Sequence, residues 1–223
     1  LSDMEDGALG ETIPDFHNTV KRFEAFQVAL KRDLKNRAVT CKPEIRFVLD
    51  READCGVLVT KQEDGRLPLR VTHNDTKLNN ILFDAKTGKG LCIIDLDTIM
   101  PGLAANDFGD SIRFGAATAA EDERNLDLMH FDLNLYELYV KGYLEETKDV
   151  LTEEEIKSLP WGARLMTLEC GIRFLTDYLQ GDTYFKTEYP EHNLVRARTQ
   201  FRLVDEMEQN FDQMQEIIRK YMK

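Results

Sequence analysis

Branched apolar residues form short runs in only one part of this chain, and that restricts the folds open to it. The runs cover residues 67–71, 80–83 and 91–94 and are separated by polar turns. Because a Lys-Thr-Gly-Lys-Gly segment connects the last two, they are predicted to form a β-hairpin. Elsewhere the apolar residues recur at helical spacing. The sequence therefore predicts a mainly α (α+β) fold with a small β-hairpin insertion.

Helices are expected before this β-rich part. Pro14, Asn18 and Thr19 indicate a helix entry, since Asn and Thr side chains accept hydrogen bonds from free amides at a helix start. The apolar spacing then continues to about Arg32. A second helical stretch follows Pro43 and stops at the Asp64-Gly65 turn. Residues 1–16 are acidic and contain glycine, so we expect a loop there.

The chain after Pro101 is expected to be helical over residues 107–119, 131–145, 152–179 and 193–221. Thr152 and Glu155 match a capping box at the start of the third helix. Pro160 is expected to break or kink that helix, because proline lacks the amide hydrogen that the helix needs. The apolar stripe of the last helix is most simply explained by burial.

Composition narrows the functional classes. The 223 residues carry a formal net charge of −12, which argues against a protein that binds duplex nucleic acid. The longest apolar runs have only a handful of residues, so no membrane span and no signal peptide are expected, although Leu1 is not an initiator methionine. The four cysteines are too far apart for a CxxC pair, and we expect buried free thiols in a reducing, cytoplasmic compartment. These are Cys41, Cys55, Cys92 and Cys170.

The β-rich part also contains the densest set of polar residues suited to catalysis. The pattern His73-x-Asp75-x-x-x-x-Asn80 lies between two apolar runs, and Asp95 follows the next run. Phosphoryl transfer from a nucleotide needs a positioned acceptor hydroxyl and cations on the phosphate oxygens. Asp75 can accept the hydroxyl proton, while Asn80 and Asp95 offer the hard oxygen ligands that Mg²⁺ prefers. Lys77 can place a positive charge near the transferred group.

The motif Thr-His-Asn-Asp-Thr-Lys-Leu-Asn-Asn at 72–80 resembles the catalytic loop of the aminoglycoside phosphotransferase and choline kinase superfamily, whose C-terminal lobe is similar to that of protein kinases. Together with Ile94–Gly102 and Asp107–Arg113, it is more narrowly similar to the N-acetylhexosamine 1-kinases. Residues 11–19 share this similarity. Those enzymes use ATP and Mg²⁺ to phosphorylate the anomeric hydroxyl of GlcNAc and GalNAc. The partners it implies are therefore a nucleotide and a small-molecule sugar.

The resemblance assigns roles to individual residues. It implies that Asp75 is the catalytic base and that Asn80 and Asp95 are the metal ligands. It also implies that Arg173 and Tyr184 contact the sugar, although a structural salt bridge would equally explain an Arg in an apolar helix. Two residues are expected to have supporting roles: His73, which is suited to holding the loop by hydrogen bonds, and Asp97. Asp107 and Asp110 are expected to cap a helix and brace the metal loop.

A complete kinase of this kind also needs an N-terminal lobe with a phosphate-covering loop and a strand-borne Lys. Gly7 and Gly10 are too sparse for such a loop, and no strand-borne Lys precedes the first helix. We therefore expect residues 1–223 to be the C-terminal lobe, with the catalytic and substrate sites. On this interpretation the chain is a fragment that begins just after the hinge between the lobes and is inactive alone.

Three alternatives remain. Asp95-x-Asp97 partly resembles the nucleophile motif of haloacid-dehalogenase-like phosphatases, although Ile99 stands where that motif usually has Thr or Val. A kinase-like module without catalysis is a second alternative. The third is a kinase of the same superfamily acting on an aminoglycoside, choline, homoserine or methylthioribose; choline would call for an aromatic cage, and Trp161 is the chain's one tryptophan. The sequence leaves the acceptor and the oligomeric state open.

Overall fold

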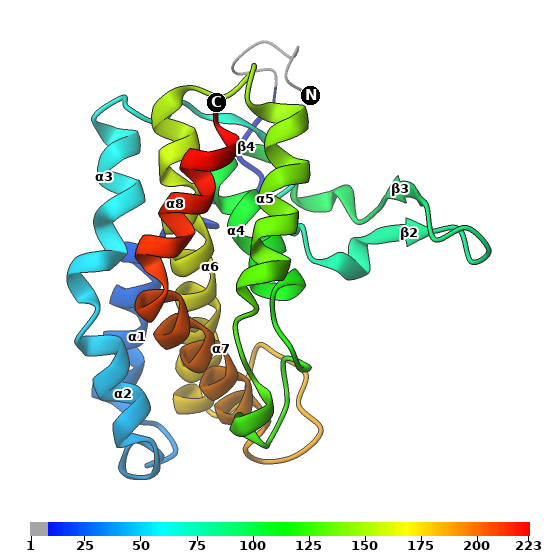
Figure 1. Cartoon of the computed structure of the whole chain (residues 1–223). Coiled ribbons are helices and arrows are strands. Elements are labelled where there is room, and N and C mark those ends of the chain that lie inside the picture. Colours follow the sequence, from blue (N-terminus) through cyan, green and yellow to red (C-terminus); the bar gives the residue numbers. More distant parts are fainter. Residues whose placement is uncertain (1–8) are drawn as a thin grey trace.

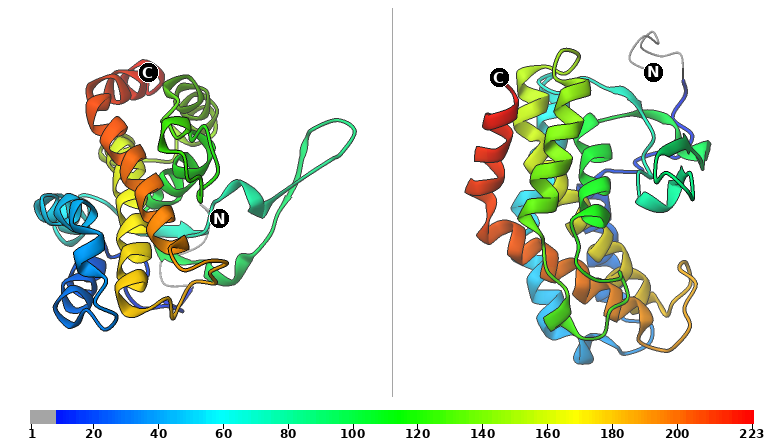
Figure 2. Two further views of the ribbon diagram at one scale, coloured as in Figure 1. Left: turned by 90° about the horizontal axis from the view of Figure 1, so that it is seen from below. Right: turned by 45° about the vertical axis from the view of Figure 1, so that its right-hand side comes forward.

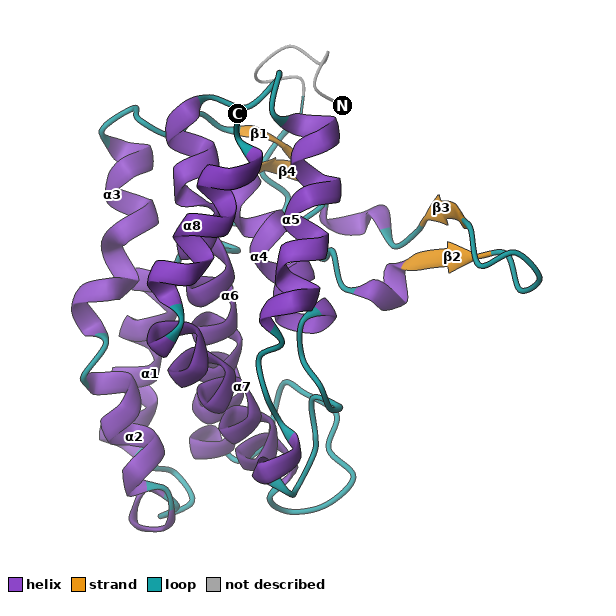
Figure 3. Cartoon of the chain, viewed as in Figure 1, coloured by secondary structure: helices purple, strands orange, loops and turns teal. Residues whose placement is uncertain are grey.

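A computed structural model describes residues 9–223, and these residues are mainly helical, as the sequence predicted (Figure 3). Within them, residues 9–16 form no helix or strand, while Gly7, Ala8 and the rest of 1–8 lie outside the described part. The helices are α1 (Thr19–Arg32), α2 (Lys42–Leu49), α3 (Val57–Glu63), α4 (Ala104–Gly115), α5 (Leu133–Thr147), α6 (Glu153–Gln180), α7 (His192–Gln209) and α8 (Phe211–Tyr221). The strands are β1 (Arg70–Thr72), β2 (Ile81–Phe83), β3 (Gly90–Ile93) and β4 (Met100–Gly102).

Helix α6 is the centre of the bundle and packs against α1, α4 and α7 (Figures 1 and 2). The predicted capping box is present, with Thr152 accepting from the amide of Glu155. Pro160 does not break this helix, because α6 runs without interruption through it, and the alternative expectation of a kink stays a prediction. Proline in a helix interior costs about 3 kcal/mol. Pro160 is buried, so packing on both sides of α6 offsets that cost.

The crossing of α4 and α6 is unusually close. A Cβ atom added to Gly109 of α4 would overlap the backbone carbonyl of Gly162 in α6, and one added to Gly162 would overlap the backbone of Ala105. Only residues without a side chain allow this approach. The contact fixes the position of α4, whose first turn carries Asp107.

Two expectations about the helices and strands need correction. Residues 193–221 form two helices, because the chain turns at Asn210 so that α8 can pack on α5. The buried Met214 and Ile218 continue the apolar stripe across this break, which is why the pattern did not reveal it. The strand β4 was not expected from Met-Pro-Gly, and it pairs antiparallel with β1, Thr72 opposite Met100.

The predicted hairpin is formed by β2 and β3, with Ile81 opposite Ile93. It projects away from the helical bundle (Figures 1 and 2). Its apolar side chains are correspondingly exposed, Leu91 by 65% and Ile93 by 58%. The two-stranded sheets β1–β4 and β2–β3 are both antiparallel and share no strand.

All four cysteines are free thiols, but they are not all buried. Burial raises the pKa of Cys41 to about 11 and the pKa values of Cys55 and Cys170 to about 12. Cys92 is exposed because it lies on the projecting strand β3, so the expectation of a buried thiol is wrong there. Across residues 9–223, no helix is both long enough and apolar enough to cross a membrane.

Candidate active site

The loop that follows β1 is held by a carboxylate from α4. Asp107 accepts hydrogen bonds from the backbone amides of His73 at 2.8 Å and Asn74 at 2.7 Å. Burial raises the pKa of Asp107, although the two amide hydrogen bonds oppose the shift. The expectation that Asp107 caps a helix is wrong, because Leu103 occupies the cap position of α4 and the Asp107 side chain reaches the loop instead. Asp110 does not cap α4 either, and pairs with Arg113 at 2.9 Å.

Further hydrogen bonds tie the same loop to the segments around it. Asn74 has left-handed backbone angles (φ 65°) and donates its side-chain amide to the carbonyl of Thr98 at 3.0 Å. The Thr98 hydroxyl donates to the carbonyl of His73 at 2.7 Å, and the His73 ring bonds the carbonyl of Ile94 at 3.1 Å. The loop shape is therefore fixed by side chains from both of its flanks.

Asp75 is partly buried, and one of its two oxygens is occupied. Its Oδ2 accepts from Lys77 Nζ at 2.6 Å and from Asn80 Nδ2 at 2.9 Å. Its Oδ1 makes no hydrogen bond with residues 9–223. The structure thus brings Asp75, Lys77 and Asn80 into one cluster and leaves one carboxylate oxygen able to accept a proton.

The two predicted metal ligands lie on adjoining segments. Asn80 directs its side-chain nitrogen to Asp75, which leaves its Oδ1 without a partner among the described residues. Its backbone carbonyl accepts from the amide of Ile94 at 2.9 Å, so Asp95 comes directly after a residue bonded to Asn80. The exposed Asp95 carboxylate likewise has no partner in residues 9–223.

The side-chain oxygens of Asn80 and Asp95 suit Mg²⁺ better than they suit a metal ion whose ligands all come from the protein. No group of three or more His, Cys, Asp or Glu side chains within residues 9–223 is arranged to hold an ion. Mg²⁺ usually takes only one or two carboxylates or amides and fills its other positions with water and substrate phosphates. Asn80 Oδ1 and Asp95 fit that role. Asp97 is exposed and makes no hydrogen bond with the described residues, so its supporting role stays a prediction.

Arg173 and Tyr184 are brought together, as a shared substrate site would require. The guanidinium carbon of Arg173, on α6, lies 5.9 Å from the Tyr184 ring, 5.5 Å from Phe185 and 5.8 Å from Phe16. Tyr184 is 73% exposed. Arg173 forms no ion pair with residues 9–223, which argues against the structural salt bridge as its explanation.

Sequence reasoning missed three residues next to the loop: His17, Thr19 and Glu169. His17 Nε2 lies 2.9 Å from the carbonyl of Asn74, and Nδ1 lies 3.0 Å from Glu169. The Thr19 hydroxyl donates to the other Glu169 oxygen at 2.8 Å. One signal was available, since Glu169 stands in an apolar helical stretch and a buried carboxylate needs a partner.

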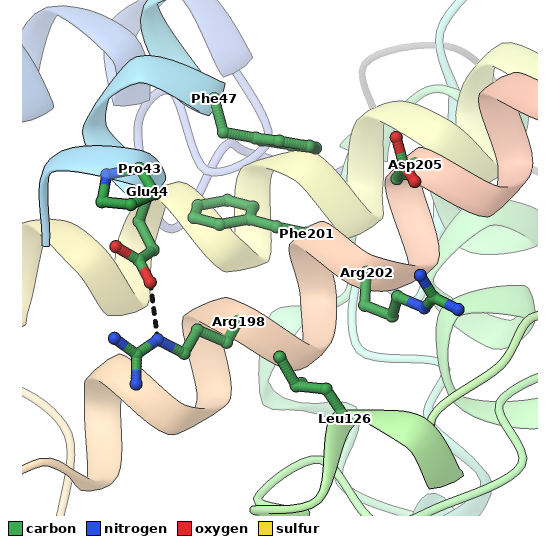
Figure 4. Close-up of a pocket in the computed structure, with 8 residues that line it drawn as sticks. All are labelled: Pro43, Glu44, Phe47, Leu126, Arg198, Phe201, Arg202 and Asp205. Carbon is green, nitrogen blue, oxygen red and sulfur yellow. Dashed lines mark hydrogen bonds and ion pairs between the residues drawn. The ribbon is translucent and has the colours of Figure 1, made fainter.

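Two cavities of about 330 Å³ have walls that do not include Asp75, Lys77 or Asn80. One is behind the loop, where Phe16, His17 and Asn74 contribute to its wall. The other lies between α2 and α7 over the stacked rings of Phe47 and Phe201 (Figure 4). None of the predicted site residues lines either cavity.

Comparison with known families adds an independent observation. A family model described as the phosphotransferase enzyme family (APH) matches residues 7–141, more than half of the chain. The chain belongs to this family. The match contains the whole Asp75 cluster and Asp95. Phosphotransferases of this family use a nucleotide and a small-molecule acceptor. Membership argues against the phosphatase alternative, as do the purely antiparallel strand pairs. Arg173 and Tyr184 lie outside the matched residues.

Proposed function

We propose that this phosphotransferase transfers the terminal phosphoryl group of ATP to the anomeric hydroxyl of an N-acetylhexosamine, GlcNAc or GalNAc. The observation that carries the proposal is the hydrogen bonding of the Asp75 carboxylate. Lys77 and Asn80 hold one of its oxygens, and the other is free to accept the hydroxyl proton. A base fixed in this way needs no rearrangement before it meets the acceptor.

The remaining residues of the cluster have supporting roles in the proposal. Asn80 and Asp95 would hold Mg²⁺, which neutralises charge on the phosphate oxygens when bound. Lys77 fixes Asp75 and places a positive charge where the transferred group passes. His73 and Asp107 keep the loop in shape through backbone hydrogen bonds.

The acceptor is proposed from the Arg173 and Tyr184 pair. Sugars present hydroxyl and acetamido oxygens that a guanidinium can donate to, and a sugar ring can lie against the exposed Tyr184. Choline is a poorer candidate, because a cation already lies within 6 Å of the rings that would have to surround it. The similarity of residues 72–80 and 94–102 to the N-acetylhexosamine 1-kinases supports the same choice of acceptor.

The lobe assignment belongs to the proposal too. Residues 9–223 are taken as the catalytic and substrate lobe of a kinase-like fold. The phosphate-covering loop and strand-borne Lys of such a fold are not among these residues. We expect residues 1–223 alone to transfer phosphate from ATP weakly or not at all.

The full-length protein tests the proposal directly. ATP consumption should require Mg²⁺ and either GlcNAc or GalNAc, and ³¹P NMR should show a sugar 1-phosphate. Choline, homoserine and an aminoglycoside serve as competing acceptors in the same assay. Asp75→Asn should lower kcat by roughly a thousandfold or more, since the base is lost. Unchanged turnover in that variant would contradict the assignment, and a preference for choline would contradict the sugar.

A further inference from the structure

His17 is a buried imidazole between the catalytic loop and the central helix. Its side chain is 7% exposed, and both ring nitrogens are within hydrogen-bonding distance of an oxygen. Nε2 faces the carbonyl of Asn74 at 2.9 Å, and Nδ1 faces Glu169 at 3.0 Å. His17 therefore connects residues that are far apart in the sequence, one of them next to Asp75.

The two partners determine how many protons His17 carries. A backbone carbonyl and a carboxylate can only accept hydrogen bonds, so both ring nitrogens must donate. A neutral imidazole has one N–H and would leave one of these contacts unmade while Glu169 is ionised. Glu169 is fully buried and accepts from Thr19 as well, and the nearby charges of Arg173 and Arg22 favour its ionised form. The contacts together with these charges favour a buried imidazolium–carboxylate pair over a neutral imidazole beside a protonated Glu169.

The contact with Asn74 acts on the peptide unit that leads into Asp75. The carbonyl of Asn74 and the amide of Asp75 belong to the same planar unit. His17 holds the oxygen end of this unit, and the Asp75 amide donates to His73 Nδ1 at 3.3 Å at the other end. Asn74 has left-handed backbone angles, so the plane is also held in a less common orientation.

We propose that His17, kept as an imidazolium by Glu169, is a positioning residue that orients the peptide plane before Asp75 and so aims the catalytic carboxylate. This inference rests on the proposed function for its catalytic consequence but not for its structural content. His17 touches no reacting atom. It acts through Asn74, and its loss tilts the plane rather than removing the base.

The surroundings of His17 favour the charged form. Burial by itself lowers the pKa of His17, but the hydrogen bond and charge of Glu169, the Asn74 carbonyl and the charge of Asp110 together raise it above 6.5. Other charged groups face the pair from the neighbouring elements. They are Asp107 on α4, Arg22 on α1 and Arg173 on α6, and the un-ionised thiol of Cys55 also faces Glu169. The two arginines act on Glu169, and help to keep its pKa lowered.

The protonation state can be measured without turnover. In ¹⁵N-correlated NMR spectra of the histidine rings, His17 should show two protonated nitrogens at about pH 6.5, where an unperturbed histidine is half neutral. Finding one unprotonated ring nitrogen in His17 at that pH would overturn the proposal. This result does not depend on any acceptor or nucleotide, so it stays decisive even if the proposed function fails.

A matched pair of variants tests the positioning role. His17→Gln removes the cation that bridges Asn74 and Glu169, whereas Thr19→Val removes a different hydrogen bond to the same Glu169. Only His17→Gln should shift the Asp75 backbone amide signal and lower kcat about tenfold, with the KM values for sugar and ATP changed less than about twofold. Equal losses of kcat in both variants would overturn the positioning role. If wild-type protein transfers no phosphate, the Asp75 amide shift alone decides.

Discussion

Lys77 is the residue whose charge is closest to the proposed base. Its Nζ lies 2.6 Å from Asp75 Oδ2. We expect Lys77→Met to lower kcat about a hundredfold, because Asp75 loses one of its two donors and the transferred group loses a cation. Steady-state kinetics in the phosphate-transfer assay described above measure the effect. Lys141→Met on the exposed side of α5 is the control and should change kcat less than about twofold; equal effects would contradict a specific role for Lys77.

The pair of His17 and Glu169 also predicts a pH dependence of stability. The pKa of His17 is raised above 6.5, so its contribution is complete below pH 6.5 and is lost as the pH rises through the folded-state pKa. The pKa of Glu169 is lowered below 4.5, because His17 outweighs the effect of burial, so its contribution is lost as the pH falls through that value. The pair should therefore stabilise the fold most between pH 4.5 and pH 6.5.

Urea unfolding of wild type and His17→Gln measures this dependence. The difference in the free energy of unfolding should be about 1–3 kcal/mol at about pH 5.5 and shrink at about pH 9. His130→Gln is a useful comparison, since His130 pairs with Glu206 at an exposed position and should matter much less. A difference for His17→Gln that does not change with pH would contradict the charged pair.

At the scale of the elements, the α4–α6 crossing is the most restrictive contact. Gly109→Ala should destabilise the protein by about 1–3 kcal/mol, because the new methyl group would overlap the Gly162 carbonyl and force the helices apart. Gly142→Ala is the matched control within a helix. Nothing lies within 4 Å of a Cβ at that position, so it should raise stability by about 0.5–1 kcal/mol. In thermal unfolding, Gly142→Ala should have the highest Tm, wild type the next and Gly109→Ala the lowest.

Elements with a local cause could be predicted from the sequence. The side chains of Asn18 and Thr152 cap their helices by accepting from backbone amides a few residues away, and the hairpin follows from its polar turn. The strand β4 and the break at Asn210 could not be predicted, since each exists because a distant element pairs or packs there. The candidate site divides in the same way. The Asp75 cluster is contiguous and was found, whereas Glu169 lies 152 positions from His17 and was not.

At the scale of the molecule, one carboxylate joins the N-terminal helices to the C-terminal ones. Glu208 on α7 accepts from Arg51, which follows α2, at 2.6 Å and from Arg164 on α6 at 2.6 Å. Arg164 also contacts Asp54. Although burial opposes it, the two arginines lower the pKa of Glu208 below 4.5. Its contribution is therefore present above pH 4.5 and lost as the pH falls through the folded-state pKa.

Replacing this carboxylate should loosen the whole bundle. Glu208→Gln leaves two partly buried arginines with one acceptor fewer, and we expect the free energy of unfolding at neutral pH to fall by about 1–3 kcal/mol. The loss should become smaller in acid, where wild-type Glu208 is itself protonated. The exposed Glu145→Gln on α5 should cost less than about 0.5 kcal/mol. A loss that stays constant through the acid range would argue against the ionised network.

Cys92 gives the molecule a single convenient attachment point for a chemical probe. Cys41 and Cys55 are buried, Cys170 is partly buried, and all three have raised pKa values, whereas Cys92 is exposed on β3. A maleimide dye added to the native protein should therefore label one position without any engineered cysteine. That position is on the strand that leads to Asp95, so a change in dye fluorescence on adding ATP would test the proposed nucleotide site.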